Sequence, residues 1–280
     1  MSPETLAFTY GLSSAVAWGA GDFTGGFATK RSNVFSVITV SQFVGGIFLV
    51  LLALGFGEKI PDFSRFLLGG LAGLSGVLGL VALYTGLARG RMGIVAPLSA
   101  VVTAVFPVIV GMSAEGLPGR AQIMGFFMAL VAIWFLSYSF SGPRVRPGEL
   151  YLPVLAGLGF GLFFILIDRA IGESVLWPLV GARIASIGVM ALFILISNRS
   201  LIPGKGQMPF MVLAGIFDAT GNAFFALATH LGRLDISAVL SSLYPAATVL
   251  LAWAILKERL RWSQWLGAII ALVSLGLIAL

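Results

Sequence analysis

Ten long apolar runs, separated by short polar connections, make up almost the whole chain. Each is close to the about 20 residues that a helix needs to cross a hydrocarbon layer ~30 Å thick. A run such as 266–280 is apolar on every side, whereas a strand of a transmembrane β-barrel alternates apolar and polar positions over about 10 residues. The pattern therefore predicts an all-α integral membrane protein with ten transmembrane helices, at approximately residues 5–29, 34–56, 64–88, 92–113, 120–140, 149–170, 174–197, 209–231, 234–256 and 262–280.

Composition excludes the soluble alternatives. Of the 280 residues, 59% are apolar and 10% are charged, against roughly 45–50% and about 25% in soluble domains. The mean hydropathy is +1.04. The chain has no cysteine and one histidine, His230, so a tetrahedral metal site is not expected. No basic residue precedes the first run, which we interpret as a span and not as a cleaved signal peptide.

The distribution of basic residues predicts an orientation in the cell membrane. Connections after odd-numbered spans carry eleven basic residues and the other side carries five, which favours cytoplasmic odd-numbered connections and both termini outside. The net charge of +6 thus indicates membrane loops and not a nucleic-acid partner. The first set is Lys30, Arg31, Arg89, Arg91, Arg144, Arg146, Arg199, Lys205, Lys257, Arg259 and Arg261, and the second is Lys59, Arg65, Arg120, Arg169 and Arg233.

The chain repeats itself at an offset of 142 residues. Residues 90–99 lie over 232–241 with six of ten positions identical, and Gly79 lies over Gly221. The halves, 1–142 and 143–280, hold five predicted spans each. Because five is odd, the second half enters the membrane from the opposite side. Inverted repeats of this kind are typical of secondary transporters, whose substrate site lies at the repeat interface near the bilayer midplane.

Several short motifs resemble the EamA-type branch of the drug/metabolite transporter superfamily. Trp18-Gly19 followed by Phe23 is similar to that family's first-helix motif. Pro245, then Glu258 to Leu260 and residues 264–267, resembles the end of its second repeat, with a looser counterpart at 114–117 and 122–125. The resemblance implies a ten-helix transporter of metabolites, amino acids or drugs, driven by protons or by exchange. Asp22 departs from the family pattern, where uncharged residues are common.

Four polar residues at membrane depth are the first candidates for a substrate site. Asp218 and Asn222 are one helical turn apart in the eighth span, Arg183 lies in the seventh and Asp22 in the first. A charge at the bilayer centre costs at least about 2.5–3.5 kcal/mol, so it normally faces a cavity or a partner. Two interpretations stay open: Arg183 and Asp218 form a structural ion pair between helices, or these groups line a substrate cavity.

Aromatic residues form a second group of candidates. Trp18, Tyr84 and Tyr244 lie deep in their predicted helices, where rings bind flat or cationic solutes by stacking and cation–π contact. Facing lipid is the alternative for any of them. Three further polar residues, which more often serve helix–helix hydrogen bonds, are weaker candidates: Gln42, Thr85 and Thr220. Proline within a span kinks a helix, and such prolines occur at Pro97, Pro107 and Pro245.

These observations favour a secondary active transporter of a small organic solute, working by alternating access and acting as an exporter. No Walker A motif is present, and we expect no enzymatic activity and no cofactor. A membrane-embedded enzyme or a receptor-like scaffold is the alternative. Protons or a counter-substrate, membrane lipid, and a monomeric or homodimeric state complete the expectation.

The predicted site is a cavity between the halves, open to one side. An amino-acid substrate would use Asp218 for its amine and Arg183 for its carboxylate. A drug-like cation would use Asp22 or Asp218 together with aromatic rings, with Arg183 neutralised by a neighbour. The residues expected on the wall or in the site are Trp18, Asp22, Tyr84, Arg183, Asp218, Asn222 and Tyr244.

Overall fold

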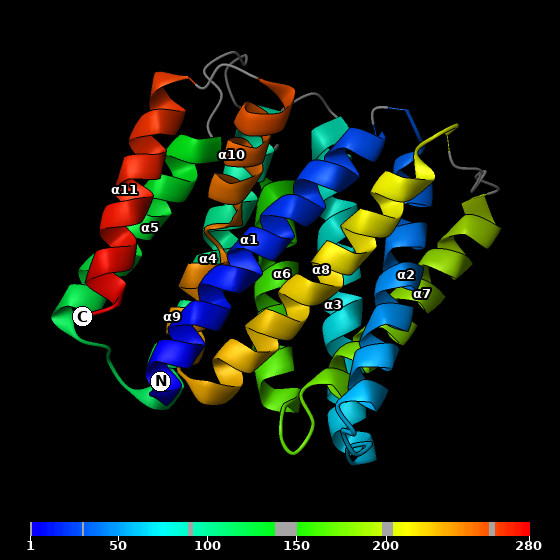
Figure 1. Cartoon of the computed structure of the whole chain (residues 1–280), viewed down its shortest axis with the longest axis horizontal. Helices are drawn as coiled ribbons and strands as arrows, with labels where there is room; N and C mark the ends of the chain where they lie inside the picture. Colours follow the sequence, from blue (N-terminus) through cyan, green and yellow to red (C-terminus); the bar gives the residue numbers. More distant parts are fainter. Residues whose placement is uncertain (1, 30, 89–91, 138–149, 198–203, 258–260) are drawn as a thin grey trace.

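A computed structural model of the chain describes residues 2–29, 31–88, 92–137, 150–197, 204–257 and 261–280. These residues form eleven helices and the turns that flank them (Figure 1). The helices are α1 (Pro3–Thr29), α2 (Val34–Gly55), α3 (Phe63–Ala88), α4 (Met92–Glu115), α5 (Arg120–Ser137), α6 (Tyr151–Ala170), α7 (Leu176–Ser197), α8 (Met208–Leu231), α9 (Leu234–Ser241), α10 (Tyr244–Leu256) and α11 (Trp262–Ile278).

Nine of the ten predicted spans each correspond to one helix, and the ninth does not. The predicted span 234–256 is broken into α9 and α10 at residues 242–243. Pro245 has no backbone N–H and cannot donate to the carbonyl four residues earlier. The chain closes around it with tighter turns, in which the N–H of Leu243 donates to Leu240 and that of Ala246 donates to Leu243. The predicted single helix is therefore wrong here, and proline is the physical reason.

Length and composition qualify seven segments to cross a membrane: α2, α3, α4, α6, α7, α8 and the stretch Leu234–Ile255 that contains the break. Two apolar helices are shorter, Arg120–Phe135 and Trp262–Ile278. α1 carries Glu4, Asp22 and several hydroxyl side chains, which lower its hydropathy. The chain is thus an all-helical, multi-pass membrane protein, and the full count of ten crossings stays a prediction.

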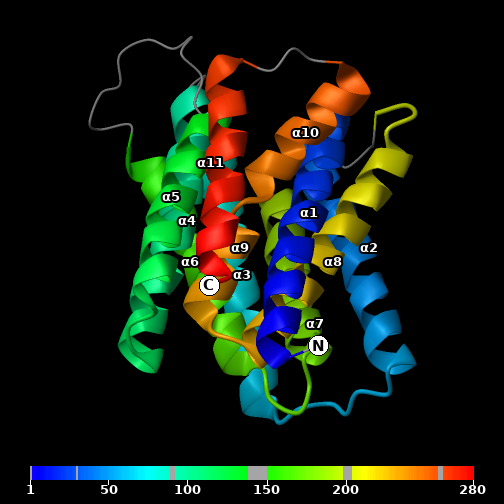
Figure 2. The same cartoon turned by 60° about the vertical axis from the view of Figure 1, so that its left-hand side comes forward.

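Most of the helix packing joins the first half of the chain to the second. α1 packs on α8 and α3 on α6; α3 packs on α7 and α2 on α8; α4 packs on α6 and α1 on α9 and α10. α5 packs on α11 and α2 on α7. If α6, α7, α8, α9–α10 and α11 are taken as the counterparts of α1 to α5, this set of pairs is unchanged when the halves are exchanged. Figures 1 and 2 both show α5 and α11 side by side.

Glycines at related positions make the closest of these contacts. A side chain at Gly221 of α8 would overlap the indole of Trp18, and a Cβ at Gly79 of α3 would lie 3.0 Å from the ring of Phe160. Gly221 and Phe160 lie 142 residues after Gly79 and Trp18, respectively. The same exchange therefore relates the two ring contacts, and only glycine leaves room for the rings at these distances.

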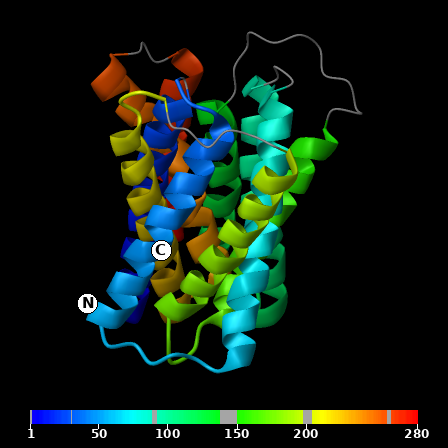
Figure 3. The ribbon, with the colours of Figure 1, turned by 90° about the vertical axis from the view of Figure 1, so that its right-hand side faces the viewer.

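The helices run between two ends of the bundle, which we call the terminal end and the opposite end. The beginning of α1 and the end of α11 lie at the terminal end, together with the turns at 56–62 and 171–175 (Figures 1 and 3). The turns at 31–33 and 204–207 lie at the opposite end. Since α6 ends at the terminal end, where α1 begins, these two helices run in opposite directions.

Candidate functional site

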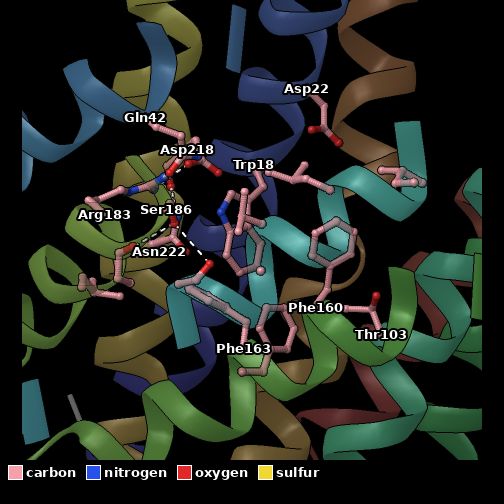
Figure 4. Close-up of a pocket in the computed structure, with 18 of the residues that line it drawn as sticks. Trp18, Asp22, Gln42, Thr103, Phe160, Phe163, Arg183, Ser186, Asp218 and Asn222 are labelled. Carbon is pink, nitrogen blue, oxygen red and sulfur yellow. Dashed lines mark hydrogen bonds and ion pairs between the residues drawn. The ribbon is translucent and has the colours of Figure 1, made fainter. Parts of the chain in front are cut away.

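A cavity of about 190 Å³ lies midway along the helices, between the two halves of the chain. Helices α1, α2, α3 and α4 contribute to its wall from the first half, and α6, α7, α8 and α10 from the second. Figure 4 shows the polar side chains on one part of this wall and aromatic rings on another.

Arg183 is held on two sides by polar groups of other helices. Its Nη1 donates to Oε1 of Gln42 at 2.6 Å, and its Nη2 donates to Oδ2 of Asp218 at 2.5 Å. The side chain of Arg183 is 8% exposed, whereas that of Asp218 is 37% exposed. Asn222 donates to the backbone carbonyl of Asp218 at 2.6 Å. The guanidinium is thus neutralised and buried, and the carboxylate that neutralises it keeps one face toward the cavity.

Asp22 stands apart from this cluster. It projects from α1 onto the cavity wall and is exposed there. Within the part of the chain that the structure describes, its carboxylate has no hydrogen bond and no ion pair. In the view of Figure 4 it lies away from Gln42, Arg183 and Asp218. An unpaired carboxylate at this depth costs at least about 2.5–3.5 kcal/mol, and contact with cavity water is what reduces that cost.

Stacked aromatic rings close the cavity toward the terminal end. Trp18 and Phe164 stack with ring centroids 5.3 Å apart and planes 4° apart, and Phe164 stacks on Phe225 at 4.2 Å. Phe164 and Phe225 are 4% and 0% exposed. Beyond them, Ile167 and Leu234 continue the same buried cluster. The packed rings and this cluster therefore separate the cavity from the terminal end.

Six of the seven predicted site residues line this one cavity: Trp18, Asp22, Arg183, Asp218, Asn222 and Tyr244. The seventh, Tyr84, lies in α3, but its side chain is outside the described part of the structure. The two interpretations of Arg183 and Asp218 turn out to be compatible in space, because the pair bridges α7 and α8 and also forms part of the wall. Whether any of the six contacts a solute stays a prediction.

Sequence reasoning ranked several lining residues too low. Gln42 appeared as a helix–helix hydrogen bond and does make one, but its partner is the cavity arginine. Two of the lining phenylalanines had a signal that was available: an offset of 142 places Phe160 over Trp18 and Phe164 over Asp22. Thr220 bonds its own helix at Ile216, and the side chain of Thr85 lies outside the described part. The other cavity residues not predicted include Thr103, Phe163 and Ser186.

Polar contacts tie the two halves together at the terminal end. The carboxylate of Glu58, in the turn after α2, accepts hydrogen bonds from the hydroxyl of Ser174 at 2.7 Å and from the N–H of Leu176 at 2.9 Å. It thereby caps the start of α7, where an anion is also favoured by the helix dipole. Arg65 donates to the carbonyl of Ile171. These bonds connect the α2–α3 turn to the α6–α7 turn.

Arg233 forms a second link at this end. From the start of α9, its Nη2 donates to the carbonyl of Gly116 at 2.6 Å, and its Nη1 donates to the carbonyl of Glu115 at 3.2 Å. The same guanidinium binds the buried carboxylate of Asp235 at 2.8 Å. This hydrogen bonding raises the pKa of Arg233 above its ordinary value, so the link stays charged at physiological pH.

The described residues hold no group of three or more histidine, cysteine, aspartate or glutamate side chains placed to bind a metal ion. His230 lies exposed in the last turn of α8. The cavity groups are thus one ion pair, one separate carboxylate, amide and hydroxyl side chains, and rings. Such groups can bind an organic solute by charge, hydrogen bonds and stacking.

Comparisons with known proteins agree with this architecture. Residues 146–280 match the model of the EamA-like transporter family. A solved structure described as a "Crystal structure of protein" is similar to the chain with a TM-score of 0.76 and 18% sequence identity, over 97% of this chain and 95% of that one. At that identity the likeness shows the fold alone. A comparison with curated proteins finds no match.

The helical bundle, with its apolar spans and its polar cavity between the halves, defines a transporter-like, multi-pass membrane protein. The part of the chain at 146–280 belongs to the EamA-like transporter family, which is a branch of the drug/metabolite transporter superfamily. The resemblance found in the motifs is thereby confirmed.

Proposed function

We propose that this protein is a secondary active transporter that moves a small organic solute by alternating access through the cavity between its halves. The observation that carries the proposal is the cavity itself, which combines an ion pair, a separate carboxylate and aromatic rings at membrane depth. Charged groups inside membranes normally mark a substrate or ion pathway. Membership of a transporter family supports the same conclusion.

We further propose that residues 1–142 and 143–280 are inverted repeats related by an axis in the membrane plane. The unchanged set of helix pairs on exchange of the halves supports this relation, and so do the opposite directions of α1 and α6. The repeats differ in chemistry at the cavity, because Asp218 and Asn222 lie 142 residues after Gly76 and Leu80. A nearly symmetric scaffold with one polar side can rock around a fixed site.

The arrangement corresponds to a state with the terminal end closed. The aromatic stack and the links of Glu58 and Arg233 seal that end, while Asp22 lies on the side of the cavity nearer the opposite end. The excess of basic residues predicts that the opposite end is cytoplasmic. A cavity that takes up solute from the cytoplasm and releases it after the terminal end opens is that of an exporter.

Counterflow in proteoliposomes tests the proposal. Vesicles loaded with an unlabelled amino acid, an organic cation or a neutral metabolite receive the labelled form outside, and saturable accumulation is the expected result for at least one solute. Gly76→Leu places a side chain in the cavity and should abolish it. Gly26→Leu is the matched control, because nothing lies within 4 Å of a Cβ at that position.

A different outcome would favour the alternative of a membrane-embedded enzyme or a receptor-like scaffold. Flux that does not saturate, or no accumulation of any solute by protein that is folded in the vesicles, would refute the transport proposal. Equal activity of Gly76→Leu and the wild type would place the pathway outside this cavity.

A further inference from the structure

The charges on the cavity wall do not cancel. The described lining contains three charged side chains: Asp22, Arg183 and Asp218. Arg183 and Asp218 are bonded to each other at 2.5 Å, and the other terminal nitrogen of Arg183 is bonded to Gln42. The pair leaves one carboxylate uncompensated, that of Asp22.

The guanidinium is poorly placed to receive a carboxylate from a solute. Both terminal nitrogens of Arg183 already donate, and its side chain is 8% exposed. An anionic or zwitterionic solute would need to displace Gln42 or Asp218 and bring a second desolvated charge to a buried site. Displacement of Asp218 would leave its carboxylate without a counterion, so binding a solute carboxylate here would replace one ion pair by another with no gain in charge compensation.

Asp22 has the surroundings that an organic cation requires. Trp18 lies one helical turn before it on α1 and therefore shares its face. The rings of Phe160 and Tyr244 line the same cavity. A carboxylate beside aromatic faces binds ammonium groups through charge and cation–π attraction. The volume of about 190 Å³ is below the range of roughly 300–1,000 Å³ found for drug-sized ligands, which indicates a small solute.

Resting on the transport function proposed above, we infer that the solute is a small organic cation with an apolar or aromatic body and that Asp22 binds its charge. The Gln42–Arg183–Asp218 cluster then shapes the wall and does not itself bind the charge of the solute. The structure thereby separates the two possibilities left by the sequence, in which either an amino acid or a cation fitted the same residues.

Equilibrium binding to the purified full chain tests the inference. The probe is radiolabelled benzyltrimethylammonium, which is charged at every pH, and the competitors are L-phenylalanine, phenylacetate and benzyl alcohol. We expect saturable binding that none of the three displaces at equal concentration. Asp22→Asn should weaken binding at least tenfold, and Asp22→Glu should restore part of the affinity.

Asp168→Asn is the matched control. It removes another carboxylate from a membrane span, in α6, that does not line the cavity, and binding should stay within twofold of the wild type. Stronger binding of L-phenylalanine than of the cation, or an affinity that Asp22→Asn leaves unchanged, would overturn the inference. So would an equal loss in Asp22→Asn and Asp168→Asn.

The two proposals fail in different ways. Saturable counterflow of a neutral or zwitterionic solute that Asp22→Asn does not alter would leave the transporter standing and refute the cation site. Asp22-dependent binding of benzyltrimethylammonium, without counterflow of any solute, would support the cation site and refute transport.

Discussion

Breaking the ion pair of Arg183 and Asp218 should have unequal effects on stability, depending on which partner is changed. Asp218→Asn leaves the guanidinium, which is 8% exposed, without a counterion, whereas Arg183→Gln leaves a carboxylate that is 37% exposed and reaches cavity water. Removing one partner of a buried pair costs about 3–5 kcal/mol. Because the introduced amide keeps a neutral acceptor for the guanidinium, we expect about 3 kcal/mol for Asp218→Asn, the lower end of that range.

Arg183→Gln should cost less. The charged hydrogen bond to Asp218 is lost, which is worth about 1.5–3 kcal/mol, but hydration of the exposed face of Asp218 recovers part of it. We therefore expect a cost of about 1–2 kcal/mol. The double variant carries neither charge, so its cost should fall short of the sum of the single variants by about 1–3 kcal/mol, the range of coupling between groups in contact.

Thermal unfolding of the purified protein in one detergent, followed by circular dichroism, measures these differences. At roughly 2–4 °C per kcal/mol, Asp218→Asn should lower the midpoint by about 6–12 °C, and Arg183→Gln by about half as much or less. Equal shifts of the two single variants would contradict the burial argument. Additive shifts, with a double variant as unstable as the sum, would refute the ion pair as a coupled unit.

Three further predictions concern packing, the closed end and orientation. Gly221→Val should lower stability by about 2 kcal/mol, as overpacking does, because its side chain would overlap the Trp18 indole; the unfolding midpoint measures this. Arg233→Gln removes a link at the terminal end, so a cysteine replacing Ala238, which is 0% exposed, should react faster with an impermeant thiol reagent. In intact cells, a cysteine at Glu173 should be labelled from outside, and one at Lys205 only after permeabilisation.

Each of these has a matched control in the same chain. Gly276→Val should leave the midpoint unchanged, because nothing lies within 4 Å of a Cβ there, and an equal loss would refute the packing argument. Arg169→Gln removes an exposed cation in the last turn of α6 and should not change labelling at 238; if it does, the Arg233 link is not specific. Labelling of the cysteine at 205 from outside would reverse the orientation.

Much of the architecture could be predicted from the chain alone, since the bilayer imposes a simple rule. A backbone in hydrocarbon must satisfy its hydrogen bonds internally, so every long apolar run becomes a helix and the runs can be counted. The family motifs and the 142-residue offset are also properties of the sequence. The break in the ninth span is the exception: Pro245 showed that a kink was possible, but Pro107 lies inside the continuous helix α4.

The candidate residues could be named in advance for a similar reason. Asp22, Arg183 and Asp218 are expensive at membrane depth, so each had to face a cavity or a partner. Which of the two applied to which residue was beyond the sequence, because spacing along one helix does not determine distances between helices. Tyr84 and Tyr244 looked alike in the sequence, yet only Tyr244 can be placed on the wall.

The sequence by itself determined the class of the protein, its helices, its division into two related halves and the polar groups that need explanation. Tertiary structure alone decided the pairing: Arg183 meets Asp218 and Gln42, and Asp22 is left without a counterion among the described residues. The physical reason is that hydropathy acts on each residue in its own helix, whereas the Coulomb energy of a charge depends on distances set by how helices from both halves pack around one cavity.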